Sequence, residues 1–404
     1  MKPNEEKQSI VILGGGFAGM RAALDLAHYL ASDEDFEIIL VDRKDYQTYY
    51  SGLYEAATTE HALIDAKKVK RTVAIPLDEV FAKTKVKVFK AYIDSIDLDN
   101  GKIVTDSRIL SFDYLVVAMG PGLEKFSFPL KSLEDAIMIR NRVEDIITKK
   151  DSATLVIGGG GFAGAEFAGE LYNLIQKECH HHNKDAKNFK LLVVEGGTSY
   201  LPGLPENVSR MVGLRLQSLG IEARFSTLIT EAGKDYIMLN KTERVDCDLL
   251  IWTGGVRAVK LPLINCTIDC DKKDRVLISD SLNLRKHERV FIAGDTGGFI
   301  DPLTKKAVAQ TAQEAIHQGK LVAKNVYRMI KAKPLLPYHP GPTRFIIPVS
   351  GKHAILYTQY LVLGGFPGWV TRRGADLRYF LSILPIFKAL KLWFFENNVF
   401  MKND

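Results

Sequence analysis

The glycine-rich stretch "GGGFAG" at residues 14–19 is repeated as "GGGGFAG" at residues 158–164, about a third of the chain further on. The first copy follows "SIVIL" (9–13), an apolar, β-branched run typical of a buried parallel strand. It is followed by "MRAALDLAHYL" (20–30), which has apolar residues at helical spacing. The glycines with G-x-G-x-x-G spacing are Gly14, Gly16 and Gly19. A strand, this turn and a helix together predict a dinucleotide-binding βαβ unit.

This kind of turn needs glycine for reasons of space. The chain must turn sharply, a pyrophosphate must approach the backbone, and the helix must pack close to the strand. The helix N-terminus then offers unpaired N–H groups to the phosphate. The next strand, "EIILVD" (37–42), ends in Asp42, and an acid at this place can bind both hydroxyls of an adenosine ribose.

The second copy has the same sequence of elements. A strand is predicted for "TLVIG" (154–158) and a helix for "AEFAGELYNLIQ" (165–176). The following strand, "LLVVE" (191–195), ends in Glu195. The glycines that repeat the spacing are Gly159, Gly161 and Gly164. The chain is therefore predicted to contain two complete dinucleotide sites.

The second helix is followed by an insert, "KECHHHNKDAKN" (177–188), which we interpret as a longer helix end and a loop. It contains the consecutive histidines His180, His181 and His182. Three consecutive histidines cannot all face one ion from a helix, so a solvated loop is favoured and no metal site is expected.

One dinucleotide would need only one of the two sites. Two different dinucleotides explain them better: FAD held permanently, and a nicotinamide that binds and leaves. Glu195 would repel a 2′-phosphate, which favours NADH over NADPH. Arg224 lies one predicted strand away and could soften that repulsion.

Length and composition fit a folded protein of two or three domains. The chain has 404 residues, of which 46% are hydrophobic and 25% charged. Its net charge of +6 suits an anionic membrane surface or anionic cofactors and is too weak to indicate nucleic acid. From the charged and polar start "MKPNEEKQS" (1–9) we expect no signal peptide. Four cysteines make no disulfide framework, so a reducing compartment is expected.

Three further segments resemble the shared signatures of flavoprotein reductases that bind two dinucleotides. They are "FDYLVVAMGP" (112–121), "VDCDLLIWTGGVRA" (245–258) and "ERVFIAGDTGG" (288–298). The resemblance covers nearly the whole chain and implies that Asp295 hydrogen-bonds the ribityl chain of the flavin. The small residues that it implies in cofactor binding are Ala118, Gly120, Gly254 and Gly255.

Within that superfamily the chain is similar to type II NADH:quinone oxidoreductases, the alternative NADH dehydrogenases. The segments that carry this likeness are "GLYEAAT" (52–58), "AGAEFAGEL" (163–171), "IWTGGVRA" (251–258) and "TAQEAIHQGK" (311–320). The second segment includes Glu166, which the resemblance places near the contact of nicotinamide and flavin. A carboxylate that only caps or pairs on its helix is the simpler reading of that residue.

The segment 311–320 resembles the quinone-site helix of this family, which has the form A-Q-x-A-x-Q. Ala312, Gln313 and Ala315 fit, but His317 stands where the family usually has its second glutamine. His317 is one helical turn from Gln313, so the two face the same way. Its imidazole can donate or accept a hydrogen bond near neutral pH. Gln313 and His317 are the quinone-side candidates, although a polar surface histidine is also compatible with the pattern.

The cysteines separate this family from close relatives. Disulfide reductases and sulfide:quinone oxidoreductases need cysteines close to the flavin, and no CxxC or CxxxxC pair occurs here. Structural or surface thiols are therefore favoured for Cys179, Cys247, Cys266 and Cys270. A sulfide or soluble-acceptor reductase, and an NADH-sensing flavoprotein with little turnover, remain alternatives.

The composition changes from Gly364 onward. Trp369, Trp393 and several phenylalanines occur among basic residues, which suits a membrane interface. The basic residues are Arg372, Arg373, Arg378, Lys388 and Lys391. Pro385 is expected to break the run into two short helices, so that it does not span a bilayer. Packing on the protein or in a homodimer is the other interpretation.

Together these features predict an α/β fold with two Rossmann-like, doubly wound domains and a short C-terminal membrane-associating segment. The expected parts are an FAD-binding domain of residues 1–150 and 271–330, an inserted NADH-binding domain of 151–270, and a membrane-facing segment of 331–404. The expected function is FAD-dependent oxidation of NADH with reduction of a membrane quinone to quinol, without proton pumping. We expect a peripheral enzyme of the respiratory chain, on the cytoplasmic face of the cell membrane.

Overall fold

The computed structural model describes residues 7–60, 66–120, 122, 128–255, 257–342 and 344–403. Residues 1–6, Pro121 and Val256 of the segments quoted above lie outside them. The chain divides into two compact units. Unit 1 comprises Met1–Gln47, Ile75–Glu124 and Val256–Gly341; unit 2 comprises Thr48–Ala74, Lys125–Gly255 and Pro342–Asp404.

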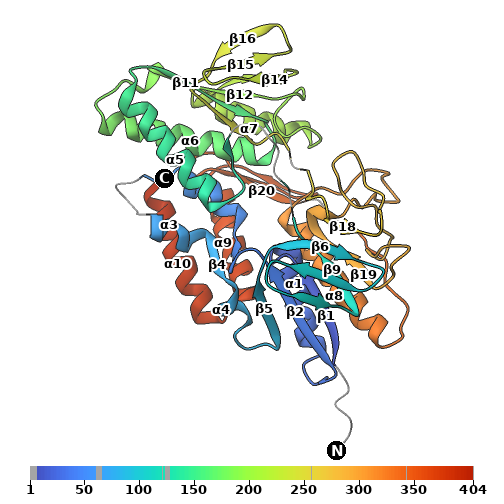
Figure 1. Ribbon diagram of the computed structural model, residues 1–404. Helices are drawn as coiled ribbons and strands as arrows, with labels where there is room; N and C mark the ends of the chain where they lie inside the picture. Colours follow the sequence, from blue (N-terminus) through green and yellow to red (C-terminus); the bar gives the residue numbers. More distant parts are fainter. Residues whose placement is uncertain are drawn as a thin grey trace, which may run out of the picture. The chain divides into compact units, whose positions relative to one another are not determined.

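Unit 1 is built on a parallel sheet with the strand order β19-β9-β1-β2-β5 (Figure 1). Helix α1 packs on β1 and β2, and α8 packs on α1. The strands β1, β9 and β19 are largely apolar and buried because both faces of the sheet are covered, whereas the edge strand β5 carries exposed lysines. The bounds are β1 Gln8–Leu13, β2 Phe36–Asp42, β5 Val86–Lys90, β9 Tyr114–Val117, β19 Val290–Ile292, α1 Phe17–Tyr29 and α8 Ala312–Ile330.

A smaller sheet covers the other face of this parallel sheet. Val11, Val41 and Val117 of the parallel strands share a buried cluster with Ile96 and Ile103 of the smaller sheet. Its strand order is β18-β6-β7-β8, with bounds β6 Ile93–Asp97, β7 Lys102–Thr105, β8 Ile109–Ser111 and β18 Leu263–Ile264. Unit 1 also holds α4 Leu77–Phe81 and η3 Gly294–Thr296. The strands β3 Tyr46–Thr48 and β4 Ala74–Pro76 form a two-stranded sheet.

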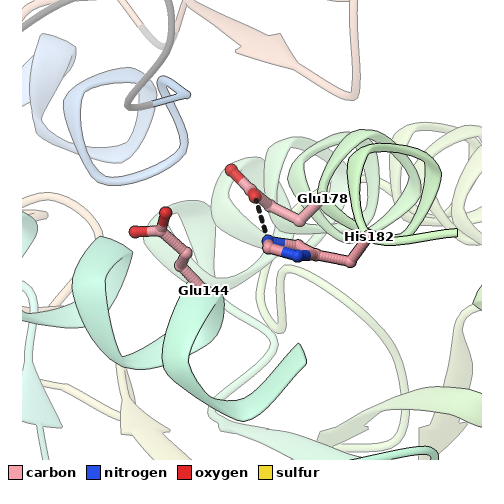
Figure 2. A group of neighbouring side chains, drawn as sticks. All are labelled: Glu144, Glu178 and His182. Atoms are coloured by element: carbon pink, nitrogen blue, oxygen red, sulfur yellow. Dashed lines mark ion pairs between the residues drawn. The ribbon is translucent and has the colours of Figure 1, made fainter. Parts of the chain in front are cut away.

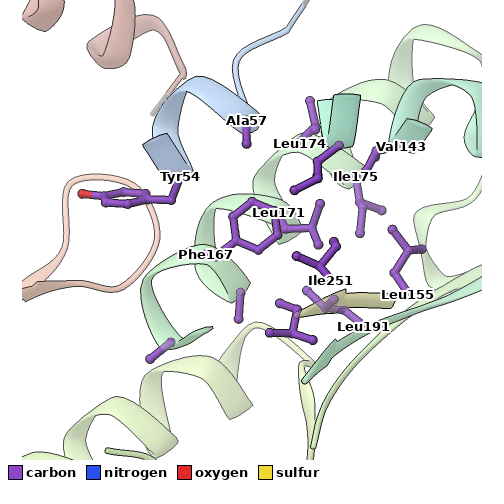
Figure 3. Close-up of a cluster of buried hydrophobic side chains, with 14 of the residues drawn as sticks. Tyr54, Ala57, Val143, Leu155, Phe167, Leu171, Leu174, Ile175, Leu191 and Ile251 are labelled. Atoms are coloured by element: carbon purple, nitrogen blue, oxygen red, sulfur yellow. The ribbon is translucent and has the colours of Figure 1, made fainter. Parts of the chain in front are cut away.

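Unit 2 repeats this layering. Its parallel sheet has the order β10-β17-β11-β12-β13. Figure 3 shows Leu155, Leu191 and Ile251 of the sheet packed against Phe167 and Leu171 of α6. The bounds are β10 Phe128–Pro129, β11 Ala153–Gly158, β12 Phe189–Val194, β13 Glu222–Arg224, β17 Leu249–Trp252, α5 Leu133–Lys149, α6 Phe162–His181, η2 Ala186–Asn188 and α7 Glu206–Ser218.

The opposite face of the second parallel sheet is covered by an antiparallel sheet, β14-β15-β16. Val156, Leu192 and Val194 share a buried cluster with Ile237 and Leu239 of β15. The bounds are β14 Ile229–Ala232, β15 Tyr236–Leu239 and β16 Glu243–Asp246. The structure therefore confirms the predicted α/β fold with two parallel sheets. In each sheet, a glycine turn joins one strand to the following helix.

The remaining elements of unit 2 come from its first and last segments, Thr48–Ala74 and Pro342–Asp404. Helix α9 packs on α10 and on β21. The two helices are separated at Leu384 and Pro385, as the proline predicted. No helix in the described ranges is both long and apolar enough to cross a bilayer. The bounds are η1 Tyr50–Gly52, α2 Leu53–Ala57, α3 Ala66–Val73, β20 Phe345–Pro348, β21 Ala354–Tyr357, β22 Val362–Leu363, α9 Phe366–Ile383 and α10 Ile386–Asn403.

The structure corrects one local prediction. The three histidines were expected in a solvated loop, but α6 continues through His180 and His181, and His182 is its C-cap. The longer helix end expected for the insert therefore includes the first two histidines, and α6 ends within residues 177–188.

Candidate functional site

The first glycine turn joins β1 to α1 in unit 1. Gly14 has a φ of +101°, and a Cβ there would lie 2.3 Å from the carbonyl oxygen of Ala118. A Cβ on Gly19 would lie 1.9 Å from the carbonyl oxygen of Gly14, so the helix approaches the turn as closely as its backbone allows. The turn thus excludes side chains at its first and last glycines, as predicted.

Asp42 holds this turn in place. It ends β2, and its Oδ2 accepts a hydrogen bond of 2.7 Å from the backbone N–H of Gly15. Its Oδ1 accepts one of 2.8 Å from the N–H of Lys44. The carboxylate is therefore fixed beside the glycine turn, where the sequence pattern predicted an acid.

The second turn, in unit 2, has nearly the same geometry. Gly159 has a φ of +110°, and a Cβ there would lie 2.5 Å from the Cα of Gly254. A Cβ on Gly164 would lie 1.9 Å from the carbonyl oxygen of Gly159. Glu195 accepts hydrogen bonds from the N–H groups of Gly160 (2.6 Å) and Gly197 (2.7 Å), as Asp42 does in unit 1.

The middle glycine of each turn leaves room for a ligand. Gly16 and Gly161 are the N-caps of α1 and α6, and both have ordinary negative φ values. An ideal Cβ on either would have no atom of the described chain within 4 Å. The fold itself does not require glycine there. Open space at a helix N-terminus is what a pyrophosphate needs, so both sites fit a dinucleotide.

The remaining small residues lie at the ends of the strands next to each turn. In unit 1, the Ala118 N–H donates to Leu13 O (2.8 Å), and Gly120 has a φ of +75°. In unit 2, Gly255 has a φ of +108°, and a Cβ on Gly254 would clash with Trp252 at 2.9 Å. Each pair thus keeps side chains away from the neighbouring turn or from the opening beside it.

Arg224 does not face Glu195. Its Nη1 lies 2.7 and 2.9 Å from the two carboxylate oxygens of Glu243 on β16. The guanidinium is thus engaged by another acid. The softening of Glu195 by Arg224 that the sequence left open is not seen in this arrangement.

Asp295 lies in η3, directly after β19, in unit 1. The Gly120 N–H donates to the Thr296 hydroxyl (3.2 Å), which joins this turn to the end of β9. Burial raises the pKa of Asp295 to about 6, and Arg275 partly opposes the shift. Asp295, Gln310 and Gln318 are among the residues that line a small pocket beside the turn.

Gln318 is a pocket residue that the sequence analysis passed over. Its Oε1 accepts a hydrogen bond of 2.7 Å from the N–H of Gly294, so it ties α8 to the turn that carries Asp295. Gln310 donates to the carbonyl oxygen of Asp295 at 3.3 Å. The signal was the second glutamine of "QEAIHQ" (313–318), displaced by one residue from the family position.

Gln313 and His317 lie on α8 and come together near Gly341. A Cβ on Gly341 would lie 3.7 Å from His317 Nδ1 and 3.9 Å from Gln313 Nε2. The His317 ring is exposed and lies 5.5 Å from the ring of Tyr338. The two candidates are therefore brought together, as the spacing predicted.

Glu314 and Tyr338 adjoin this pair and were not predicted. The Tyr338 hydroxyl donates to Glu314 Oε2, and burial together with this contact raises the pKa of Tyr338. Glu314 was identifiable only as the fourth residue of a T-x-x-E capping box, in which the Thr311 hydroxyl accepts from the Glu314 N–H. Its contact with Tyr338 joins residues 24 positions apart.

Glu166 lies in the first turns of α6, two residues after Gly164. Burial raises the pKa of its carboxyl to about 8, and Glu55 adds to the shift while Arg372 opposes it. At neutral pH most copies therefore carry a proton. Such a shifted group next to a glycine turn is typical of functional sites.

A buried ionic cluster in unit 2 was missed, and here the sequence interpretation is wrong for two residues. Arg372 and Arg373 were grouped with the basic flanks of a membrane surface, but both are buried. Arg372 pairs with Asp376, which also accepts from the Tyr49 hydroxyl, and Arg373 Nη2 lies 2.8 Å from Glu55 Oε1. The spacing of Arg372 and Asp376, one helical turn, was the available signal.

The cysteines are all free thiols. Cys179 and Cys247 are buried, and burial raises the pKa of Cys179 to about 11 and that of Cys247 to about 12. Burial also raises the pKa of Cys266 and Cys270. A raised pKa disfavours the thiolate that redox catalysis requires.

Comparison with known proteins agrees with this geometry. The family model for pyridine nucleotide-disulphide oxidoreductases matches residues 8–319. A type II NADH:quinone oxidoreductase of Staphylococcus saprophyticus is 26% identical over 349 residues, which are 82% of this chain and 84% of that protein. The enzyme of the same name from Staphylococcus aureus is 26% identical over 348 residues, 81% and 84% of the two chains.

Two solved structures share the fold. NDH2 of Plasmodium falciparum, solved in complex with NADH, has a TM-score of 0.81 at 15% identity, with 98% of each chain covered. The sulfide:quinone oxidoreductase of Aquifex aeolicus has a TM-score of 0.77 at 17% identity, with 94% of each chain covered. Because the family model covers most of the sequence and both glycine turns lie within it, the chain belongs to the pyridine nucleotide-disulphide oxidoreductase family.

Proposed function

We propose that this chain is an FAD-dependent NADH:quinone oxidoreductase that does not pump protons. The observation that carries the proposal is the pair of matching glycine turns, one in each unit, each held by an acid from the next strand. Two such sites suit two dinucleotides. The reaction is that of the type II enzymes to which 82% of the chain is similar.

FAD is assigned to unit 1. Gly14, Gly16 and Gly19 would hold its pyrophosphate, Asp42 its ribose, and Asp295 its ribityl chain; Ala118 and Gly120 would leave room beside it. The half-buried carboxyl of Asp295, with a pKa of about 6, can donate or accept a hydrogen bond near neutral pH. Bound flavin supplies the chemistry that amino acids lack, since it accepts a hydride from NADH and gives two electrons to a quinone.

NADH is assigned to unit 2. Gly159, Gly161 and Gly164 would hold the pyrophosphate, with Gly254 and Gly255 lining the same opening. Glu195 would accept hydrogen bonds from the ribose and repel a 2′-phosphate, and Arg224 is engaged by Glu243. We therefore propose a preference for NADH over NADPH.

Glu166 would act on the nicotinamide side as a carboxyl that keeps its proton at neutral pH. Its raised pKa lets it donate a hydrogen bond where an ordinary glutamate would present a negative charge. We propose that it orients the nicotinamide and does not form a covalent bond.

The quinone would be bound by Gln313 and His317. Both present donors and acceptors on the same side of α8, near Gly341. Glu314 and Tyr338 adjoin them and would position His317 through the ring contact of Tyr338. Quinone oxygens accept hydrogen bonds, so donors in this place suit the substrate.

Peripheral membrane binding would involve α9 and α10. These helices expose Phe387 (84%), Phe394 (62%) and Met401 (47%), which recur at seven-residue spacing on α10. Exposed apolar residues at helical spacing, with Lys388 and Lys391 nearby, are typical of a helix that lies on a lipid surface. We propose the cytoplasmic face of the cell membrane, and a homodimer as the alternative use of this surface.

The sequence division into 1–150, 151–270, 271–330 and 331–404 remains a proposal for the flavin, nucleotide and membrane-facing parts. Its boundaries differ from those of the two compact units, because residues 48–74 and 125–150 belong to unit 2 and residues 256–270 to unit 1.

Steady-state assays with different electron donors test the proposed reaction. We expect NADH to reduce a short-chain quinone at least about tenfold faster than NADPH, with sulfide inactive. Turnover driven by sulfide without NADH would instead identify a sulfide-oxidising relative. Binding of NADH with very slow turnover on every quinone would favour an NADH sensor.

A further inference from the structure

The far end of α6 carries a second cluster of functional groups, about 30 Å along the helix from its glycine turn. Glu178 and His182 are one helical turn apart on α6, and Glu144 lies across from them on the neighbouring helix α5 (Figure 2). The three side chains each offer one possible ligand atom, and these three atoms lie within 4.8 Å of one another.

Glu178 is the least usual member of this cluster because its side chain is only 6% exposed. Among the described residues, its carboxylate forms one ion pair, with His182 Nε2 at 3.8 Å. That distance is too long for a hydrogen bond. Burial and the neighbouring Glu144 both raise the pKa of Glu178. A buried carboxylate beside another acid is costly unless a cation compensates.

The place also favours a cation for a separate reason. His182 is the C-cap of α6, where the carbonyl groups of a 20-residue helix create a partial negative charge. Glu60, which pairs with His181 at 3.7 Å, adds a further acid nearby, and Lys177 lies 3.3 Å from the same carboxylate. The C-terminus of α6 and Glu144 therefore add negative charge near Glu178 and His182, whereas Lys177 offsets the charge of Glu60.

We propose that Glu144, Glu178 and His182 form a binding site for a divalent transition-metal ion, with Zn²⁺ as the best match. Imidazole together with two carboxylates is a common donor set for Zn²⁺, and water can complete the coordination. The three ligand atoms must move closer by side-chain rotation to reach bond lengths of about 2.0–2.2 Å.

Binding would join the ends of α5 and α6. The Nε2 atom of His182 lies 3.3 Å from Thr148 Oγ1, one helical turn beyond Glu144 on α5. That hydroxyl can accept or donate a hydrogen bond at the site's edge.

The test is a Zn²⁺ titration of the full-length chain in competition with a chromophoric chelator. Cys266 and Cys270, the two thiols that are not buried, are first replaced by serine in every protein tested. We expect one bound ion, with affinity at least about tenfold weaker in E178Q, E144Q and H182A. Binding that these variants do not weaken overturns the proposal.

His180 offers the matched control because it is exposed, belongs to the same three histidines and is absent from the cluster. H180A should keep the affinity within about twofold. H181A tests the neighbouring pair with Glu60, and equal losses in H180A, H181A and H182A would show non-specific binding by the histidine run.

A second readout does not depend on redox activity. Zn²⁺ should raise the melting temperature of the parent protein and of H180A, but not of H182A, because it binds only the folded state. Circular dichroism checks that E178Q folds; H182A alters the helix end and provides the same test if E178Q does not. A metal-independent melting temperature in the parent protein contradicts the site.

Discussion

The two glycine turns have nearly the same backbone but different neighbours. Gly14 and Gly159 have φ values of +101° and +110°, and the acid of the next strand accepts from the second N–H of each turn. Two residues after the last glycine, however, α1 has Arg21, which pairs with Asp25, whereas α6 has Glu166, whose pKa is about 8.

This comparison separates two kinds of information. The backbone of the turn determines that a dinucleotide can bind, because it excludes side chains and presents N–H groups. The residue that follows determines what surrounds the ligand: a neutralised ion pair in unit 1, and a carboxyl that holds a proton in unit 2. The first is a binding feature, and the second can take part in a reaction.

The largest effects are expected from closing either turn. Cβ atoms at Gly19 and Gly164 would lie 1.9 Å from backbone oxygens, so neither G19A nor G164A fits without moving its helix. We expect G19A to lose the flavin, and G164A to keep it while losing reduction by NADH. Flavin-to-protein ratio and NADH-dependent bleaching measure the two outcomes. Loss of flavin in G164A alone would reverse the assignment of the units.

Arg372 is the charged neighbour that opposes the pKa shift of Glu166, and its removal tests the buried ionic cluster. Replacing Arg372 by alanine leaves the buried Asp376 with only its longer ion pair to Arg373, at 3.7 Å. Loss of one partner from a buried pair costs about 3–5 kcal/mol of unfolding free energy. R378A, at an exposed position on the same helix, should cost less than about 0.5 kcal/mol. Urea unfolding measures both. Equal stability of the two variants would contradict the buried cluster, and R378A alone should weaken binding to anionic vesicles.

Alanine at the middle glycine of each turn tests whether the open space there serves a ligand or the fold. Gly16 and Gly161 have open surroundings, so G16A and G161A should fold with melting temperatures within a few degrees of the parent, about 1 kcal/mol or less. We expect weaker FAD binding in G16A and a raised KM for NADH in G161A, each by about tenfold. Unchanged binding in both would mean that the open space is not used by a pyrophosphate.

A further effect concerns the dependence of stability on pH. The pKa of Glu166 is raised in the folded protein to about 8 from an ordinary value of 4.5, so folding favours its protonated form. This stabilising contribution is complete below pH 4.5 and is lost as the pH rises through 8. E166Q should therefore flatten the fall of the melting temperature between pH 5 and 9.

Glu396 supplies the control for this prediction, because burial also raises its pKa to about 8. E396Q should flatten the same stability profile. Only E166Q should remove an apparent pKa near 8 from the pH profile of kcat/KM for NADH. If E396Q removes it and E166Q does not, Glu166 is not the group on the nicotinamide side.

The sequence was sufficient for features that depend on local spacing. Both turns, Asp42, Glu195 and the break at Pro385 follow from neighbouring residues and from strand and helix periodicity. Contacts between distant segments were not predictable in this way. Arg373 meets Glu55 from 318 positions away, and Asp376 meets Tyr49 from 327. A pair of arginines among aromatic residues has the same local pattern whether it faces lipid or a buried acid.

The position of the histidines shows the same limit. Their run suggested a loop because polar residues usually follow an apolar helix, yet α6 includes two of them, and the third is its C-cap. Only the packing of α5 beside α6 brings Glu144 to Glu178 and His182.

Anaerobic double-mixing stopped flow tests the proposed reaction most directly. The purified flavoprotein is first mixed with NADH and then with a short-chain quinone, while flavin absorbance is followed. Rapid bleaching by NADH and rapid return of colour with quinone are the predicted result. Bleaching without return of colour would contradict quinone reduction, and failure of NADH to bleach the flavin would contradict the assignment of the second glycine turn.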